Sequence, residues 1–139
     1  MRFFFYGTLI DPDVRTLVLG REAAASCRVE PANLPGWRAV RVQGKTYPAV
    51  VERRGATTGG MIADGLPEAA MARLIAYEGP EYVVRDLPVE IGADGGRTVA
   101  SVFVAGPECR ITTAFWRFAD WERRDKRRFV AALRSGRLV

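Results

Sequence analysis

Histidine is absent from the 139 residues of this chain. Without histidine there is no Ser-His-Asp or Cys-His nucleophilic system, and no metal site built on imidazole. The chain also lacks a Walker-type Gly-rich phosphate loop and a GxGxxG sequence after a strand. If the protein is an enzyme, its acid–base chemistry must therefore come from Asp, Glu, Tyr, Lys or Cys.

Cysteine and long apolar runs are also scarce. The two cysteines, Cys27 and Cys109, show no metal-type spacing, and we expect both to be reduced thiols. No apolar run approaches the roughly 20 residues that cross a bilayer. The N-terminus has one basic residue, Arg2, and no small-residue cleavage site, which argues against a signal peptide. These features predict a cytoplasmic protein with no membrane partner.

Positive charge is concentrated near the C-terminus. Residues 1–109 carry 12 Lys/Arg against 13 Asp/Glu, whereas residues 110–139 carry 9 against 3. One hypothesis is a helix that contacts the phosphates of nucleic acid, which a salt-dependent gel shift would test. The favoured interpretation is an amphipathic closing helix with a solvated basic face and an available Glu122–Lys126 pair. A nucleic-acid partner is therefore not expected, and the inward residues would be Phe118, Trp121, Phe129, Ala132 and Leu133.

Local patterns predict one α+β domain over residues 1–139. The expected strands cover Arg2 to Phe5, Trp37 to Val42, Tyr47 to Glu52, Met61 to Ala63, Val83 to Ile91 and Thr98 to Val104. Helices are expected from Pro12 to about Gly20, from Pro67 to about Glu78, and from about Asp120 to Leu133. Between them, Pro31 to Pro35 is expected to form a loop and Gly55 to Gly60 a turn. Mostly antiparallel connections then favour a small mixed, partly closed β-barrel with about three flanking helices.

A carboxylate interrupts the apolar face of the second predicted helix. Met71, Leu74 and Ile75 form the apolar stripe, and the next position on that stripe is Glu78. Burial among apolar groups raises the pKa of a carboxyl, as a general acid–base near neutral pH requires. The alternative is that Glu78 reaches water at the frayed last turn or pairs with Arg85.

The first strand breaks at Gly7-Thr8, just before the Asp11-Pro12 helix cap. Glycine allows close approach of a ligand, and successive backbone N–H groups in such a turn can hold an anion. A plain strand-to-helix turn explains the same residues. Tyr6 likewise has a structural interpretation, as a core aromatic residue whose hydroxyl finds a partner at the edge.

Two motifs together resemble the γ-glutamylcyclotransferase-like superfamily, closest to its small members related to plant avirulence-induced proteins. The family's Tyr-Gly-(Thr/Ser)-Leu loop corresponds to the residues from Tyr6 to Leu9, and its Glu-Gly-x-x-Tyr element to the residues from Glu78 to Tyr82. Arg85 holds the usual basic position, and the residues from Thr46 to Val51 resemble a family strand. The resemblance spans roughly Arg2 to Gly106.

The resemblance implies a small barrel with a cavity at one end and conversion of a γ-glutamyl amide to 5-oxoproline with release of the amine. Backbone N–H groups of Gly7, Thr8 and Leu9 would hold the substrate α-carboxylate, and Glu78 would act as general acid–base. The substrate's own α-amino group is the nucleophile, so no metal or cofactor is implied. Further substrate-binding or supporting residues would be Tyr6, Tyr82, Tyr47 and Arg85.

The chain departs from the family pattern at two places. Family members often carry an acidic residue shortly before the catalytic glutamate, where this chain has Ile75-Ala76. A tyrosine common in the late strand is replaced by Phe103, which removes a hydroxyl from the expected site. Because fold likeness does not establish activity, the same fold could instead serve as a small-ligand binding module or another acyl-group enzyme.

Overall fold

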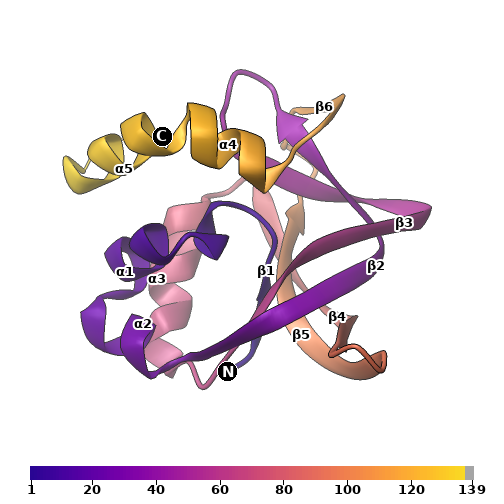
Figure 1. The fold of residues 1–139 in the computed structure, drawn as a ribbon. Coiled ribbons are helices and arrows are strands. Elements are labelled where there is room, and N and C mark those ends of the chain that lie inside the picture. Colours follow the sequence, from indigo (N-terminus) through magenta and orange to yellow (C-terminus); the bar gives the residue numbers. More distant parts are fainter. Residues whose placement is uncertain (137–139) are drawn as a thin grey trace.

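Five strands close into a barrel in the computed structural model, which describes residues 1–136 (Figure 1). In chain order they are β1 (Phe3–Phe5), β2 (Arg28–Val42), β3 (Pro48–Asp64), β4 (Tyr82–Ile91) and β5 (Gly96–Ala105). Their spatial order is β3-β1-β5-β4-β2, and pairing of β2 with β3 closes the ring. β1 and β5 are parallel, whereas the other neighbouring pairs are antiparallel. The expected mixed α+β barrel is confirmed, and it is closed rather than partly open.

The aromatic run of β1 is continuous because both faces of this strand are buried. Successive strand residues point to opposite faces. Phe3 and Phe5 join the apolar core between the barrel and the helices. Phe4 and Tyr6 join a second core, made by residues of the barrel strands. β1 therefore lies between the two apolar cores, and the loop that follows it begins in the interior of the protein.

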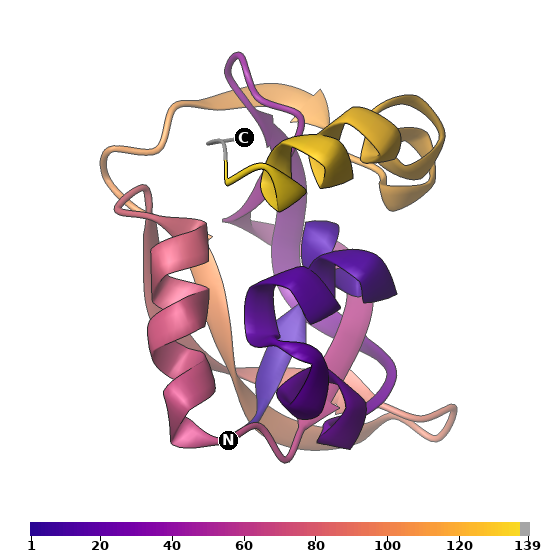
Figure 2. The same cartoon turned by 90° about the vertical axis from the view of Figure 1, so that its left-hand side faces the viewer.

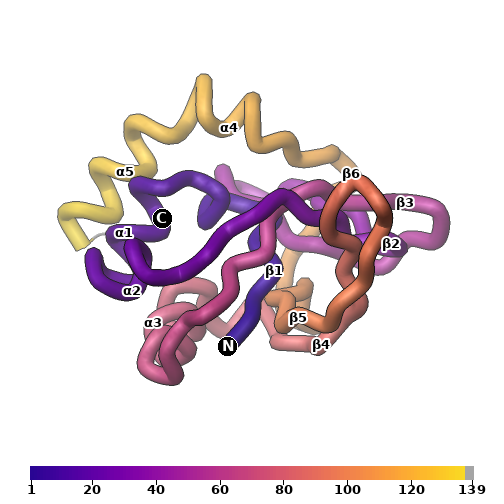
Figure 3. Tube along the Cα trace, turned by 60° about the horizontal axis from the view of Figure 1, so that its bottom comes forward, coloured from indigo at the N-terminus to yellow at the C-terminus, as the bar shows by residue number. Residues whose placement is uncertain are grey.

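Helices cover one side of the barrel, with α3 beside the α1–α2 pair and α4–α5 across one end (Figures 2 and 3). Their bounds are α1 (Pro12–Leu19), α2 (Arg21–Ser26), α3 (Glu68–Glu78), α4 (Phe118–Arg124) and α5 (Lys126–Arg134), preceded by a short 3₁₀ helix, η1 (Thr8–Ile10). The predicted helices that begin near Pro12 and Pro67 are confirmed. Among the described residues, no helix is long and apolar enough to cross a membrane.

The expected single C-terminal helix is wrong, because it is broken at Asp125 into α4 and α5. The break has a packing reason. On a straight helix, eight residues span about 12 Å, yet the rings of Trp121 and Phe129 meet edge to face with centroids 5.4 Å apart. Both side chains are buried, so the bend lets the two halves share one core.

The expected loop from Pro31 to Pro35 and turn from Gly55 to Gly60 are also wrong, because both segments belong to long strands. β2 tolerates its prolines because, among the described residues, it pairs with β4 only at Ala32 and Asn33. Few backbone N–H donors of β2 are therefore needed along this edge, and the missing N–H of a proline costs little there. The glycine-rich segment pairs regularly with β2 from Thr57 to Gly60, and an irregularity in the pairing precedes it. There Pro35 pairs with Thr57 and Trp37 with Glu52, so residues 53–56 have only one residue of β2 opposite them.

Within residues 1–136, the short η1 helix and two further elements were absent from the sequence prediction. One is α2, a short helix that follows Gly20 directly. The other is β6 (Ile111–Phe115), which pairs antiparallel with the outer part of β2 at Val40 and Val42. The residues of β6 are all exposed or half-buried, so this strand lacks the apolar periodicity that identifies a strand from sequence.

Candidate active site

A pocket of about 70 Å³ opens where the end of β1, the start of β3 and the end of α3 meet. We call it the Glu78 pocket. Strands β4 and β5 and helix α5 complete its wall. Its lining residues are Phe4, Phe5, Tyr6, Gly7, Thr8, Leu9, Tyr47, Pro48, Tyr77, Glu78, Tyr82, Phe103 and Phe129. Every residue that the sequence nominated for the site, except Arg85, lies in this wall.

Glu78 is the last residue of α3, and Gly79 follows it with a φ of 80° that ends the helix. The apolar stripe differs from the prediction, because Ile75 is 52% exposed. The buried positions are Ala70 and Leu74, and Glu78 follows Leu74 by four residues. Glu78 therefore faces the pocket because it lies one helical turn after the buried Leu74, although the buried stripe is rotated relative to the predicted one.

The Glu78 carboxyl has no compensating partner. Burial away from water raises its pKa to about 8. Among the described residues, no ion pair or hydrogen bond reaches this carboxyl, and the pairing with Arg85 considered from the sequence does not form. A buried carboxyl without such a partner keeps its proton more tightly than a solvated one.

Four tyrosine hydroxyls surround this carboxyl and stay protonated at neutral pH. Burial raises the pKa of each phenol above its ordinary value, and the nearby Glu78 charge adds to the effect: Tyr6, Tyr47, Tyr77 and Tyr82. Of residues 1–136, no lysine, arginine or second carboxylate lines the pocket. Among the described lining residues, Glu78 is thus the group that can exchange a proton near neutral pH.

The phenol groups nominated for the site are already engaged by the protein. Tyr6 donates to the carbonyl oxygen of Phe103 at 2.5 Å, and Tyr82 donates to that of Pro48 at 2.6 Å. Tyr47 donates to the Glu81 carboxylate at 3.0 Å. None of these hydroxyls hydrogen-bonds to Glu78 in the described part of the chain.

Arg85 lies outside the pocket. Its exposed guanidinium stacks over the ring of Trp37, with Cζ 5.4 Å from the ring centroid. Phe103, by contrast, is part of the pocket wall, where its ring stacks on Phe3 with centroids 5.7 Å apart. The departure from tyrosine at this position therefore places an apolar ring edge where a hydroxyl was expected.

The loop after β1 presents free backbone donors to the pocket. Gly7, Thr8 and Leu9 line it. Within residues 1–136, none of their three N–H groups donates a hydrogen bond, because they precede or begin the short η1 turn. The loop carbonyls are engaged instead, since Arg15 donates to those of Leu9 and Ile10 at 3.0 and 2.6 Å. The loop that lines the pocket is therefore fixed through its carbonyl groups, while the three N–H groups keep their hydrogen-bonding capacity.

Two pocket residues escaped the sequence analysis. The hydroxyls of Tyr77 and Thr8 share a hydrogen bond of 2.6 Å, which ties α3 to the loop. Tyr77 follows Leu74 by three residues, so the helical period contained a signal for it. Phe129 comes from α5 and was predicted only to point inward; no local pattern indicated that it reaches the pocket.

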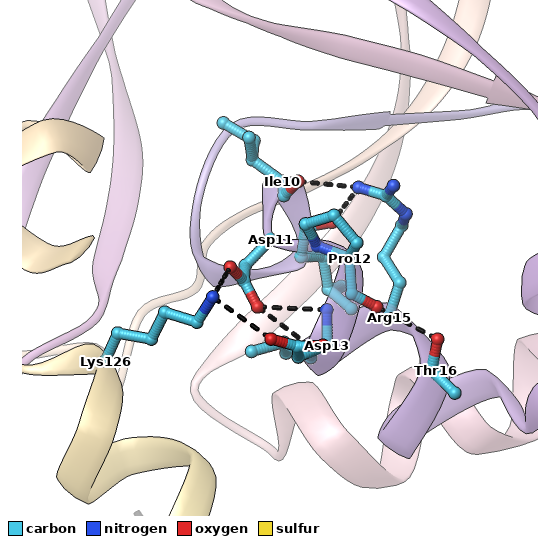
Figure 4. A network of polar contacts seen from close by, with 9 residues as sticks. Ile10, Asp11, Pro12, Asp13, Arg15, Thr16 and Lys126 are labelled. Carbon is cyan, nitrogen blue, oxygen red and sulfur yellow. Dashed lines mark hydrogen bonds and ion pairs between the residues drawn. The ribbon is translucent and has the colours of Figure 1, made fainter.

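An ion-pair network fastens α5 to the start of α1 (Figure 4). Asp11 is 1% exposed, and its Oδ2 accepts hydrogen bonds from the N–H groups of Asp13 and Val14. The Lys126 ammonium lies 2.7 Å from Asp11 Oδ1 and 3.1 Å from Asp13 Oδ2. The Glu122–Lys126 pair is therefore not formed, because Lys126 turns toward α1. This contact, which we call the Lys126 clasp, lies one helical turn before Phe129.

Removing the clasp is expected to destabilise the protein. In Lys126→Met the nearly buried Asp11 charge loses its counter-ion, which should lower the free energy of unfolding by about 1–3 kcal/mol. Urea denaturation at neutral pH measures the change. Arg127→Met is the matched control, since Arg127 is exposed and makes no ion pair among the described residues. Equal losses in the two variants would show that the clasp contributes nothing.

No group of three or more Cys, Asp or Glu side chains within the described residues is arranged to hold a metal ion. Cys109 lies near the pocket, and burial raises the pKa of its thiol, with the Glu81 charge adding to the effect.

The sequence matches a family of known proteins. A profile described as gamma-glutamyl cyclotransferase, AIG2-like, matches residues 3–123. AIG2-like protein A of Arabidopsis thaliana is 28% identical over 138 residues, which cover 95% of this chain and 78% of the relative. Protein AIG2 B of the same plant is 25% identical over 130 residues, which cover 93% of this chain and 75% of the relative.

Solved structures share the fold. A solution structure of an Arabidopsis thaliana protein superposes with a TM-score of 0.68 and 25% identity, covering 94% of this chain and 86% of that one. A structure named gamma-glutamyl cyclotransferase superposes with a TM-score of 0.64 and 16% identity, covering 79% of this chain and 68% of that one. At the lower identity the likeness establishes the fold alone.

Proposed function

Because this chain belongs to the gamma-glutamyl cyclotransferase, AIG2-like family, we propose that it converts a γ-glutamyl amide to 5-oxoproline and releases the amine. The observation that carries the proposal is the Glu78 carboxyl, whose pKa burial raises to about 8. It lines the same pocket as the unpaired N–H groups of the loop after β1. A carboxyl in this range takes up and returns a proton near neutral pH.

The proposed reaction needs one proton carrier. The α-amino nitrogen of the glutamyl group attacks its own γ-carbonyl carbon, so a C–N bond forms and the five-membered ring closes. Glu78 takes the proton that this nitrogen loses. The amide C–N bond then breaks, and Glu78 returns the proton to the departing amine. Holding the substrate folded accounts for part of the rate, because ring closure depends on orientation.

Recognition of the substrate carboxylate is assigned to the backbone. None of the lining residues that the structure describes is basic, so the N–H groups of Gly7, Thr8 and Leu9 are the backbone donors available for an anion. The pocket volume of about 70 Å³ corresponds to roughly five water-sized sites. That space suits one glutamyl group and leaves the amine portion of the substrate outside.

Release of 5-oxoproline from a panel of γ-glutamyl amino acids and γ-glutamyl amines tests the proposal. The panel includes neutral, anionic and cationic departing amines, because the pocket itself does not enclose that portion. Release from any member supports the reaction. If no member reacts although isothermal titration shows that one binds, the protein is a small-ligand binding module with the same fold.

The pH dependence of the reaction is expected to follow Glu78. As a base it must be ionised, so below about pH 8 its titration should lower kcat/KM by roughly tenfold per pH unit. The substrate ammonium group titrates in the same direction. Carboxyl ¹³C NMR of the free protein, assigned with Glu78→Gln, therefore separates the two, and a Glu78 midpoint near 4.5 would contradict the burial seen here.

A further inference from the structure

A second hollow, separate from the Glu78 pocket, is lined by residues of β2 and β3 and of the segment in which β6 leads into α4. Its volume is about 290 Å³, and it shares only Tyr6 with the Glu78 pocket. We call it the Arg38 hollow. Among the described residues, its wall contains two arginines, Arg38 and Arg117, and no carboxylate. The hydroxyl-bearing residues Thr57 and Thr58 and the ring of Phe115 also line it.

The two arginines are without counter-ions. Neither forms an ion pair with a carboxylate in the part of the chain that the structure describes. The Nε–H of Arg38 is moreover buried and lacks a hydrogen-bond acceptor. Leaving a buried donor unsatisfied is costly, and in native structures it commonly marks a missing water, ion or ligand.

The Arg38 guanidinium is held in one orientation. It lies over the ring of Phe115, with Cζ 4.3 Å from the ring centroid. This contact fixes the position of the guanidinium carbon, and when a guanidinium stacks on an aromatic ring its N–H groups remain available along the edge of its plane. A planar edge of N–H donors fits the two oxygens of a carboxylate or phosphate. Part of the Phe115 ring remains available, because the residue is 46% exposed.

We propose that the Arg38 hollow binds a small molecule that carries an oxyanion, a carboxylate or a phosphate, attached to a planar ring. Arg38 and Arg117 neutralise the oxyanion, and the Thr57 hydroxyl adds a donor. The planar ring of the ligand lies against Phe115 and Phe118, which both border the hollow. The site uses none of the groups assigned to the cyclisation, so it stands or falls independently of that reaction.

Binding of AMP and of benzoate, each followed by ¹⁵N–¹H NMR and isothermal titration calorimetry at low salt, tests the proposal. Both probes carry an oxyanion on a planar ring, and adenosine supplies the ring without the charge. We expect AMP or benzoate to shift the amides of residues 57–59 and Arg117, and adenosine to leave them unchanged. Binding of AMP alone identifies phosphate as the recognised group, whereas binding of benzoate alone identifies carboxylate.

Variants connect the binding to the two arginines. Arg38→Met should weaken the probe that binds by about tenfold or more, since a charge-assisted hydrogen bond is lost. Arg38→Lys keeps the charge but loses the planar donor edge, and should also weaken it. Arg41→Met is the matched control, because Arg41 is an exposed arginine of β2 outside the hollow. No binding at millimolar concentration, or equal binding by wild type and Arg38→Met, would overturn the proposal.

Discussion

Glu78→Gln is expected to lower 5-oxoproline release by roughly 10²–10⁴-fold, the range that a positioned general acid–base contributes. Glutamine preserves the shape of the side chain and removes its capacity to carry the proton between the two nitrogens. Because recognition of the substrate carboxylate is assigned to the backbone of Gly7, Thr8 and Leu9, KM should change little while kcat falls.

The same substitution is expected to stabilise the fold at alkaline pH. The folded state holds the Glu78 proton up to a pKa of about 8, well above the ordinary value of 4.5. The contribution of Glu78 to the free energy of unfolding of the wild type is therefore most favourable at acid pH, and it declines as pH rises from about 4.5 through 8. Above that range Glu78→Gln should be more stable by roughly 2–4 kcal/mol, which is less than the full pKa shift implies because the residue as a whole is half-buried.

The combination of lost activity and gained stability separates a catalytic role from misfolding. Glu68→Gln is the matched control, since Glu68 lies exposed in the first turn of the same helix. It should leave both kcat and the pH dependence of unfolding unchanged. Full activity of Glu78→Gln would refute the assignment of the proton carrier. A variant with low activity but no stability gain at alkaline pH would refute burial of the charge.

Gly60→Ala is expected to prevent folding or to lower the free energy of unfolding by more than about 3 kcal/mol. A Cβ at this position would lie 2.2 Å from the carbonyl oxygen of Phe5 and 2.9 Å from Phe4 Cζ. Neither neighbour can yield easily. Phe5 is paired with β3 through Met61, and Phe4 is buried in the barrel core. The methyl group would therefore separate β1 from β3.

Gly59→Ala provides the neighbouring control. A Cβ there would find its nearest neighbour, Asn33 Oδ1, at 3.6 Å, which is ordinary contact. Its free energy of unfolding should stay within about 1 kcal/mol of the wild type. Urea denaturation measures both variants, with soluble yield recorded for Gly60→Ala. If the two alanine variants unfold at the same urea concentration, the close approach of β1 and β3 does not govern stability.

Local signals in the sequence were sufficient to predict where several helices and strands lie. The aromatic run before Gly7 marked β1, Asp11-Pro12 marked the start of α1, and Gly79-Pro80 marked the end of α3. Each signal acts within a few residues, because a cap, a fixed φ or a missing N–H affects only its own turn of backbone. The family resemblance drawn from the Tyr6–Leu9 and Glu78–Tyr82 motifs is confirmed by the profile match.

The apolar stripe that predicted an inward-facing Glu78 included Ile75, which is exposed in the structure. The stripe runs through Ala70 and Leu74 instead. The error arose because Ile75 is apolar by composition, while burial depends on where the neighbouring elements lie. Periodicity can identify the buried face of a helix to within about one residue. The packing of the helix against the barrel then determines which residues of that face are buried.

Local patterns located where the chain breaks, and composition identified which residues can carry a proton and which nucleophilic systems are excluded. The pairing of β2 with β3 came from the folded structure, because the prolines and glycines of these segments resemble loop sequences unless a partner strand supplies backbone hydrogen bonds. The hydrogen bond between Tyr77 and Thr8, the ion pair between Lys126 and Asp11 and the position of Phe129 in the pocket wall likewise came from the folded structure. These contacts join residues far apart in the chain, and they exist because closing the barrel brings those segments together.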